Sequence, residues 1–359
     1  MIAFLNWLDG VLWGVPLIAL MILTGLYFTV RSGFFQFRHF GWIMKRTGGK
    51  LFQKEDKASE GKGMLSSFEA ISTAIGGTVG FGNIAGVATA VAAGGPGAIM
   101  WMWLSSLLGM ILKQVEVTLG CYYRHTNEKG EYYGGPTYYM ECGLGEERHW
   151  GKLWLIPALI FGIGIFSTFF VTSSNLTASQ VVAGAFGIEN INLGSFKVEG
   201  VIVMGVLLCI LTYVVTSGGT LALSAFASGF GKFGSILLAV IMVIFTVTTS
   251  GGWFTYYLAI LEHLYKKEGK MKDIVMKIFY AVRALPGVLW TIYLVKTNNQ
   301  GFIWTVVDIT SAIPTFVNVA VILILSNQYF KLLKDYKARN FGQGTVDKNA
   351  CLFYEEKTK

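Results

Sequence analysis

Apolar segments of about 20 residues recur along the 359-residue chain, and loops rich in lysine and arginine separate most of them. A helix of about 20 apolar residues spans the hydrocarbon core of a bilayer, so each segment is a candidate span. The expected spans are residues 11–30, 65–92, 97–120, 153–185, 199–217, 233–258, 275–295 and 301–326. The pattern predicts an all-α polytopic membrane protein, with about eight spans in one integral membrane domain over residues 1–359.

Residues 71–97 carry no charge, yet their middle is rich in residues that disfavour a helix. The glycines there are Gly76, Gly77, Gly80, Gly82 and Gly86. Each is about 1 kcal/mol less favourable than alanine inside a helix. Beside Thr78 and Asn83, they favour a helix that breaks at membrane depth, where free N–H and C=O groups can bind a small zwitterion and a cation. A glycine-rich packing face between helices is the alternative interpretation.

Four motifs resemble one transporter family over most of the chain. They are GNIAGVATAVAAGGPGAIMWMWLSSLLGM, which begins at Gly82, GGPTYY at 134–139, FTVTTSGGW at 245–253, and Asp308 with Ala312-Ile313-Pro314. The chain resembles the alanine or glycine:cation symporters, also called sodium:alanine symporters. The resemblance implies a leucine-transporter-like fold with two inverted repeats of five helices and one broken helix in each repeat.

The resemblance also implies a sodium site and an amino-acid site. Sodium, as a hard cation, prefers oxygen ligands, and the matching positions are carbonyls around Gly80 and the hydroxyls of Thr248 and Thr249. The matching substrate-binding positions are Thr78, Gly80, Phe81, Gly82, Asn83, Asn175 and Trp253. The threonines can instead return hydrogen bonds to their own helix.

Several positions depart from the family pattern. Phe81 replaces the usual threonine, and it narrows the pocket or shifts its selectivity. Phe170 and Ser173 stand where an asparagine and a glutamine are usual, and Tyr257-Leu258 replaces Gly-Glu.

Composition independently favours a membrane protein. Hydrophobic residues make up 53% of the chain and charged residues 14%, which is too apolar for a water-soluble domain. The net charge of +8 is spread over the loops, so a nucleic-acid partner is not expected. The four cysteines show no metal or redox spacing, and the four histidines form no metal or catalytic pattern.

The distribution of lysine and arginine predicts the topology. Basic residues are concentrated in 31–62, 121–152 and 331–359, which the positive-inside rule places in the cytoplasm, with the N-terminus outside. Residues 31–62 also alternate aromatic and basic residues, which favours an interfacial helix over a plain solvated loop. The expected location is the plasma membrane, with the C-terminal tail cytoplasmic.

One loop breaks the alternation of sides. Residues 266–272 carry four lysines and should be cytoplasmic, but the visible spans put this loop outside. The family's second broken helix is also not found. We therefore expect an internal deletion of about three transmembrane helices, with a junction near Gly219–Thr220 or earlier, near residue 190.

Asp308 is an acid inside a span, which suggests function by default, and Arg283 is its candidate ion-pair partner. The expected function is sodium-coupled symport of alanine or glycine across the lipid bilayer, with sodium as the co-transported ion. A degenerate, non-transporting member of the family is the first alternative. A membrane-bound enzyme or a passive pore lacks the polar residues it needs, and the oligomeric state stays open.

Overall fold

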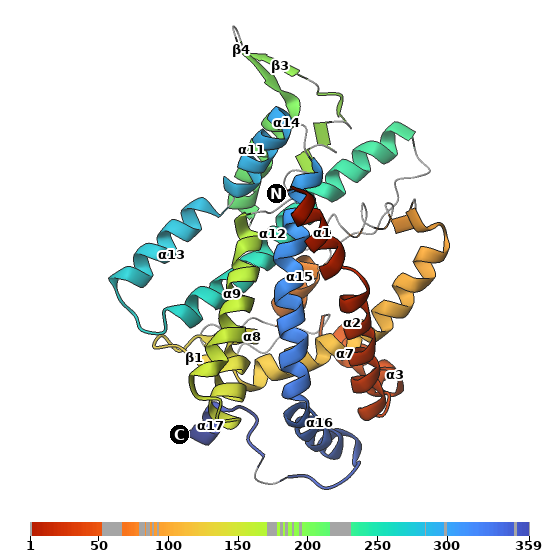
Figure 1. The fold of residues 1–359 in the computed structure, drawn as a ribbon, viewed down its shortest axis with the longest axis vertical. Helices are drawn as coiled ribbons and strands as arrows, with labels where there is room; N and C mark the ends of the chain where they lie inside the picture. Colours follow the sequence, from red (N-terminus) through yellow and green to blue (C-terminus); the bar gives the residue numbers. More distant parts are fainter. Residues whose placement is uncertain are drawn as a thin grey trace.

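The computed structural model describes residues 2–51, 67–78, 83, 87, 90–91, 93–170, 178–179, 182–183, 186–188, 190–193, 196–215, 231–283, 285–297, 300–347 and 350–358. These residues form a bundle of tilted helices with two short hairpins (Figure 1). The first helices are α1 (Ile2–Leu12), α2 (Val15–Arg31), α3 (Phe35–Arg38), α4 (Phe40–Leu51), α5 (Ser67–Thr78) and α7 (Gly97–Tyr122).

The middle of the chain alternates short elements with long helices. Antiparallel β1 (His125–Thr126) and β2 (Tyr132–Tyr133) lead into α8 (Pro136–Tyr139), a π-helical turn (Met140–Glu147), a 3₁₀ turn (Gly151–Trp154) and α9 (Leu155–Phe170). Antiparallel β3 (Asn190–Leu193) and β4 (Phe196–Glu199) precede α11 (Gly200–Val215) and α12 (Gly231–Leu264). The last helices are α13 (Lys270–Val282), α14 (Leu285–Thr297), α15 (Gln300–Ile324), α16 (Ser326–Phe341) and α17 (Glu355–Thr358).

Four helical segments of the described chain are long and apolar enough to cross a bilayer. They are Ile2–Arg31, Gly97–Tyr122, Gly151–Phe170 and Trp304–Ile324. The segments Lys270–Val282 and Leu285–Tyr293 would add a fifth crossing, bent by 45°. The predicted all-α polytopic class is thus confirmed. The expected number of eight spans remains a prediction, because several expected spans run through residues outside the described ranges.

Proline explains two differences between the expected and the observed helices. The first helical segment starts at Ile2 rather than residue 11 and is interrupted at Trp13-Gly14, just before Pro16 opens α2. The expected span 275–295 is divided into α13 and α14 beside Pro286. Proline lacks the N–H that a continuous helix needs, but it is tolerated in the first turn of a new helix.

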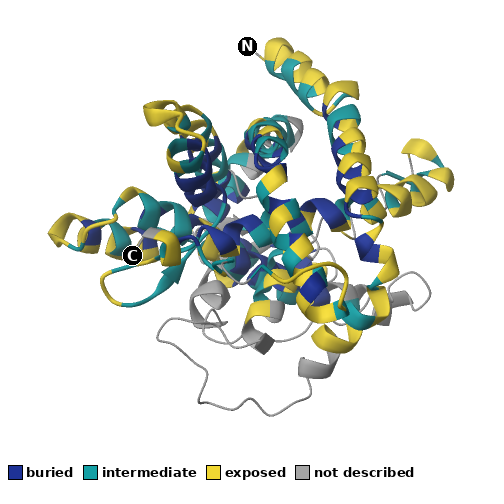
Figure 2. Ribbon diagram, turned by 90° about the horizontal axis from the view of Figure 1, so that it is seen from below, coloured by how far each residue is buried: buried dark blue, intermediate teal, exposed yellow. Residues whose placement is uncertain are grey.

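Clusters of buried hydrophobic residues pack the described helices together, and two of them are well defined. In the larger one, Phe28 of α2, Tyr139 of α8 and Tyr329 of α16 are almost fully buried. The smaller one joins α9, α12 and α13 through Phe169, Tyr257 and Phe279. Buried residues follow the inner faces of the helices, whereas outer faces are exposed (Figure 2). Many exposed side chains are large and apolar, as expected for helices that face lipid.

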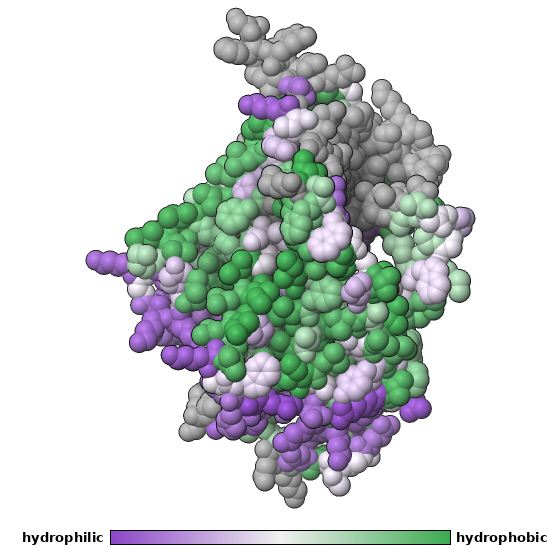
Figure 3. Space-filling view, in the orientation of Figure 1, coloured by the Kyte–Doolittle hydropathy of each residue, from purple (hydrophilic) through white to green (hydrophobic). Residues whose placement is uncertain are grey.

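Polar residues gather at one end of the molecule. The face shown in Figure 3 has a broad apolar band, and hydrophilic residues lie below it, where α16 and α17 are found. Lys337 donates a hydrogen bond to the Ser32 carbonyl at 2.6 Å, and Lys357 pairs with Glu147 at 2.7 Å. Parts of the basic segments 31–62, 121–152 and 331–359 therefore lie at the same end, as the positive-inside argument requires.

Candidate functional site

The glycine-rich stretch meets the Phe245–Trp253 motif where α5 packs on α12. A Cβ added at Gly76 would lie 3.2 Å from both the Cβ and the carbonyl oxygen of Thr248. A Cβ at Gly252 would lie 2.5 Å from the Gly77 Cα and 3.2 Å from the Thr73 carbonyl oxygen. We call this contact the α5–α12 seam. It brings together two motifs that are about 170 residues apart in the chain.

Gly252 has no room for a side chain, because an added Cβ would overlap backbone atoms of Gly77, which cannot rotate away, and Gly76 has little room against Thr248. Small residues let membrane helices approach until their backbones touch. The glycine packing that was expected as an alternative to a broken helix is therefore present at Gly76 and Gly77. The expected break beyond Thr78 falls on residues outside the described ones and stays a prediction.

Several oxygen atoms lie at the seam. The Thr73 and Thr248 carbonyls lie at the contact, and the Thr248 hydroxyl donates to the carbonyls of Ile244 and Phe245 at 2.9 and 3.2 Å. The expected back-bonding of Thr248 is thus observed. A hydroxyl that donates its proton keeps lone pairs, so the same oxygen can still coordinate a hard cation. Thr249, the next residue, is buried.

The predicted substrate residues are only partly described. Thr78 is exposed at the end of α5, and its hydroxyl donates to the Ala74 carbonyl at 2.6 Å. Asn83 is an exposed residue. Gly80, Phe81, Gly82 and Asn175 lie outside the described residues.

Trp253 lies one residue beyond the seam glycine on α12 and is half-buried. Its ring centroid lies 5.9 Å from that of Tyr256 and 6.1 Å from that of Tyr257. The Tyr257 hydroxyl forms a hydrogen bond of 2.9 Å with Thr168 of α9. Tyr257, where the family has glycine, thus packs α12 against α9, and sequence reasoning gave it no role.

The expected Arg283–Asp308 ion pair is wrong. Arg283 lies at the bend between α13 and α14, with its guanidinium carbon 5.2 Å from the Phe254 ring centroid. Asp308 instead faces α1, where Trp13 donates to the Asp308 carbonyl oxygen at 2.9 Å and the Asp9 carboxyl is its charged neighbour.

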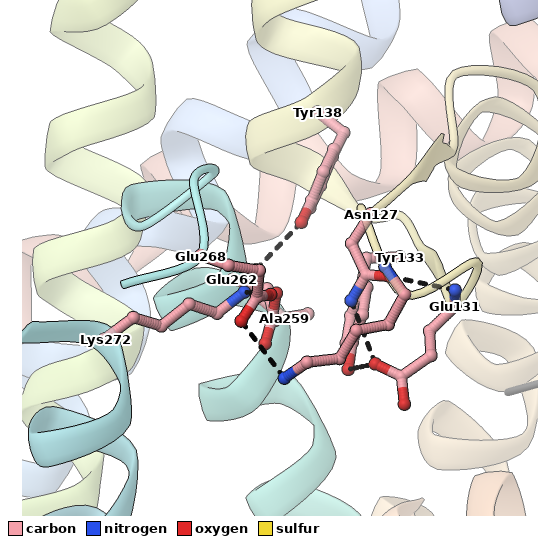
Figure 4. Close-up of polar contacts among 9 residues, drawn as sticks. Asn127, Glu131, Tyr133, Tyr138, Ala259, Glu262, Glu268 and Lys272 are labelled. Carbon is pink, nitrogen blue, oxygen red and sulfur yellow. Dashed lines mark hydrogen bonds and ion pairs between the residues drawn. The ribbon is translucent and has the colours of Figure 1, made fainter. Parts of the chain in front are cut away.

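A polar network at the basic end was missed by sequence reasoning. Lys272 of α13 is buried between Glu262 at 2.6 Å and Glu268 at 2.7 Å (Figure 4). Lys129, in the loop between β1 and β2, pairs with Glu268 at 3.1 Å. These hydrogen bonds from Lys272 and Lys129 lower the pKa of the Glu268 carboxyl. The network ties the end of α12 to the loop after α7.

Glu141 makes a second connection between the same segments. His263 contacts its carboxylate at 2.8 Å, and Lys266 pairs with it at 2.5 Å. Burial alone would raise the pKa of the Glu141 carboxyl, but the hydrogen bonds from His263 and Lys266 outweigh it and lower the pKa to about 2. The lysine-rich loop 266–272 therefore lies at the same end as residues 121–152.

The chain was compared with known proteins. The sequence model described as "Sodium:alanine symporter family" matches residues 1–224 and again residues 216–349. An uncharacterized transporter of Haemophilus influenzae is 49% identical over 167 residues, which are 46% of this chain and 35% of the relative. The sodium/alanine symporter AgcS of Methanococcus maripaludis is 35% identical over 220 residues, or 61% and 44% of the two chains. The probable sodium/glutamine symporter GlnT of Bacillus subtilis is 38% identical over 200 residues, or 55% and 39%. The matches thus cover less than half the length of these relatives.

Proposed function

The chain belongs to the sodium:alanine symporter family, and on that premise we propose that it takes part in sodium-coupled symport of a small neutral amino acid, alanine or glycine, into the cell. The family is one of transport proteins, so an enzymatic role is set aside. The described helices and the family together make the chain a multi-pass membrane protein. We propose the plasma membrane as its location, with the N-terminus outside and the tail 331–359 in the cytoplasm.

The α5–α12 seam is the observation that carries the proposal. It places Gly76 of α5 against Thr248 and Gly252 of α12 beside the Thr73 carbonyl, so oxygen atoms of both helices lie at the contact. Such a set suits sodium, which prefers oxygen ligands. We assign the ion to Thr248, Thr249 and carbonyls around Gly80, which follows α5 in the chain.

We assign the amino acid to the same region of the chain, at Thr78 and the residues that follow it. Half-helix termini at membrane depth present N–H and C=O groups to a zwitterion. The proposed contacts are Thr78, Gly80, Phe81, Gly82, Asn83, Asn175 and Trp253. A phenylalanine at position 81 takes more room than threonine, which favours a substrate with a small side chain.

We propose further that the chain has a shortened form of the family's fold. The family model matches in two segments that meet at residues 216–224, which supports a junction near Gly219–Thr220 and the loss of about three spans there. Because the amino acid is held between two broken helices in transporters of this kind, we expect the 359-residue chain to bind sodium at the α5–α12 seam and the missing segment to be needed for transport. A non-transporting member of the family is the second candidate function, favoured by the same two-part match.

Uptake of labelled alanine into proteoliposomes tests the proposal. The 359-residue chain is compared with a chain in which a relative's intervening segment is inserted at Gly219–Thr220. We expect sodium-dependent uptake only by the restored chain. Sodium-dependent uptake by the 359-residue chain would refute the need for the second broken helix, and no uptake by a well-folded restored chain would favour the non-transporting alternative.

A further inference from the structure

A cavity of about 280 Å³ lies at the basic end of α7, apart from the α5–α12 seam. One face of α7 lines it, since the lining residues recur at helical spacing, and the turn 134–136 and Tyr256 of α12 close the other side. The α7 residues and the one that follows them are Lys113, Glu116, Val117, Gly120, Cys121 and Arg124. The volume equals that of about nine water molecules, enough for a small amino acid.

One wall of this cavity is formed where Gly134 packs closely against the backbone of α7. A Cβ at Gly134 would lie 2.4 Å from the Gly120 carbonyl oxygen, so the turn after β2 rests directly on the α7 backbone. The GGP motif thus fixes the wall that faces α7.

The cavity is lined by two basic residues, of which one has an ion-pair partner and the other has a donor without a partner in the described parts of the chain. Lys113 pairs with Glu116 at 3.0 Å. Arg124 is held differently, because its guanidinium carbon lies 4.2 Å from the Tyr132 ring centroid and 3.5 Å from that of Phe353. Its Nε is buried and has no hydrogen-bond partner among the described residues. A buried donor without a partner is costly, and a carboxylate is the ligand that a guanidinium fork fits best.

Tyr256 connects this cavity with the seam. It lies one turn after Gly252 on α12, and its ring carbon Cε2 lies 3.9 Å from the position that a Cβ of Gly77 would take. Its hydroxyl accepts a hydrogen bond from Lys113 at 3.4 Å. One aromatic ring therefore lies between the cavity and Gly77 of the seam.

We propose that the α7 cavity is a vestibule on the cytoplasmic side of the seam, where Arg124 binds the carboxylate of the transported amino acid after it has passed Tyr256. The inference rests on the proposed function for the identity of its ligand. The ligand class is a small amino-acid zwitterion, and the Lys113–Glu116 pair lies along its path with a carboxylate for the ammonium group.

Cys121 lies in the cavity wall and is exposed, so it serves as a probe of occupancy. The experiment uses the full chain in nanodiscs, with Cys142, Cys209 and Cys351 replaced by serine. The rate of Cys121 alkylation by N-ethylmaleimide is measured with and without L-alanine, and with acetate or ethylamine as half-ligands. We expect alanine to slow alkylation at least tenfold at saturation, acetate to protect in part, and ethylamine, which lacks the carboxylate that Arg124 binds, to protect less than acetate.

Substitution of Arg124 shows whether the protection is local. Arg124→Gln should raise the alanine concentration needed for protection by about 10- to 100-fold, as expected for loss of a charged hydrogen bond. Arg124→Lys should restore part of it, and Arg38→Gln, an exposed arginine that does not line the cavity, should change nothing. The alkylation rate without alanine and the elution profile of each variant control for misfolding.

Three results would overturn the inference. The first is that alanine does not protect Cys121, and the second is that alanine protects Cys121 equally well in Arg124→Gln. The third is that phosphatidylglycerol in the nanodisc protects Cys121 and alanine adds no further protection, which would identify a lipid headgroup as the ligand. Failure of the proposed function looks different. In that case alanine protects Cys121, but the restored chain shows no sodium-dependent uptake. Sodium-coupled uptake with an unprotected Cys121 would instead leave the function standing and remove the vestibule.

Discussion

Replacing Gly252 with alanine should weaken sodium binding, because the seam between α5 and α12 has no room for a Cβ. The added carbon would lie 2.5 Å from the Gly77 Cα and 2.6 Å from the Gly77 nitrogen. Non-bonded carbon atoms prefer separations of about 3.5–4.0 Å, so the two helix backbones must part by about 1 Å. Both contact atoms belong to backbone, and no side-chain rotation can relieve the overlap.

The size of the effect follows from the cost of overpacking. Inserting a methyl group into a well-packed contact typically costs about 1–3 kcal/mol. If that cost falls on the closed seam that holds the ion, sodium affinity should drop by about 5- to 150-fold. Gly109→Ala in α7 is the matched control, because a Cβ there meets nothing within 4 Å and alanine favours a helix.

The assay is the rise in thermal unfolding midpoint of the purified chain as sodium is added, since a ligand that binds the folded state stabilises it more as its concentration exceeds the dissociation constant. We expect Gly252→Ala to need far more sodium than the parent or Gly109→Ala for the same rise. A Gly252→Ala variant that responds to sodium like the parent would refute the reasoning that the closed seam forms the site.

Three further predictions address the ligands, the polar network and the topology. Thr248→Val and Thr249→Val each remove one oxygen while keeping shape, so sodium should stabilise either variant less than the parent, with expression unchanged; two variants that respond like the parent would place the site elsewhere. The Glu141 carboxyl, with its pKa lowered to about 2 from an unfolded value of about 4.3, should stabilise the fold fully above about pH 4.3 and lose this contribution as pH falls toward 2; the unfolding midpoint of Glu141→Gln should lack this part of the pH dependence, and identical profiles would contradict it. A cysteine at Gly269, where a Cβ meets nothing within 4 Å, in a chain without its four native cysteines, should react with an impermeant thiol reagent only after cells are opened; full labelling of intact cells would put loop 266–272 outside.

Local patterns predicted the helices and the contacts within one helix. The apolar segments gave the helical class, and Lys113 and Glu116, three residues apart, form the pair that their spacing favours. The contact of α5 with α12 followed only from the family resemblance, because no periodicity links positions so far apart.

Contacts between distant segments were the part that the sequence could not supply. Glu141 meets His263 and Lys266 over more than 120 residues, and each of these residues alone is typical of a solvated loop. The Arg283–Asp308 pairing failed because the two residues have other neighbours, Phe254 for Arg283 and Asp9 for Asp308. Gly80 and Asn175, which lie outside the described residues, stay predictions.

Direct binding of radioactive sodium to the purified 359-residue chain tests the central claim, that the α5–α12 seam forms a sodium site in this chain. The account predicts saturable binding that excess unlabelled sodium displaces and potassium does not, without the segment that we propose to be missing. Binding that does not saturate, or that potassium displaces equally well, would contradict it.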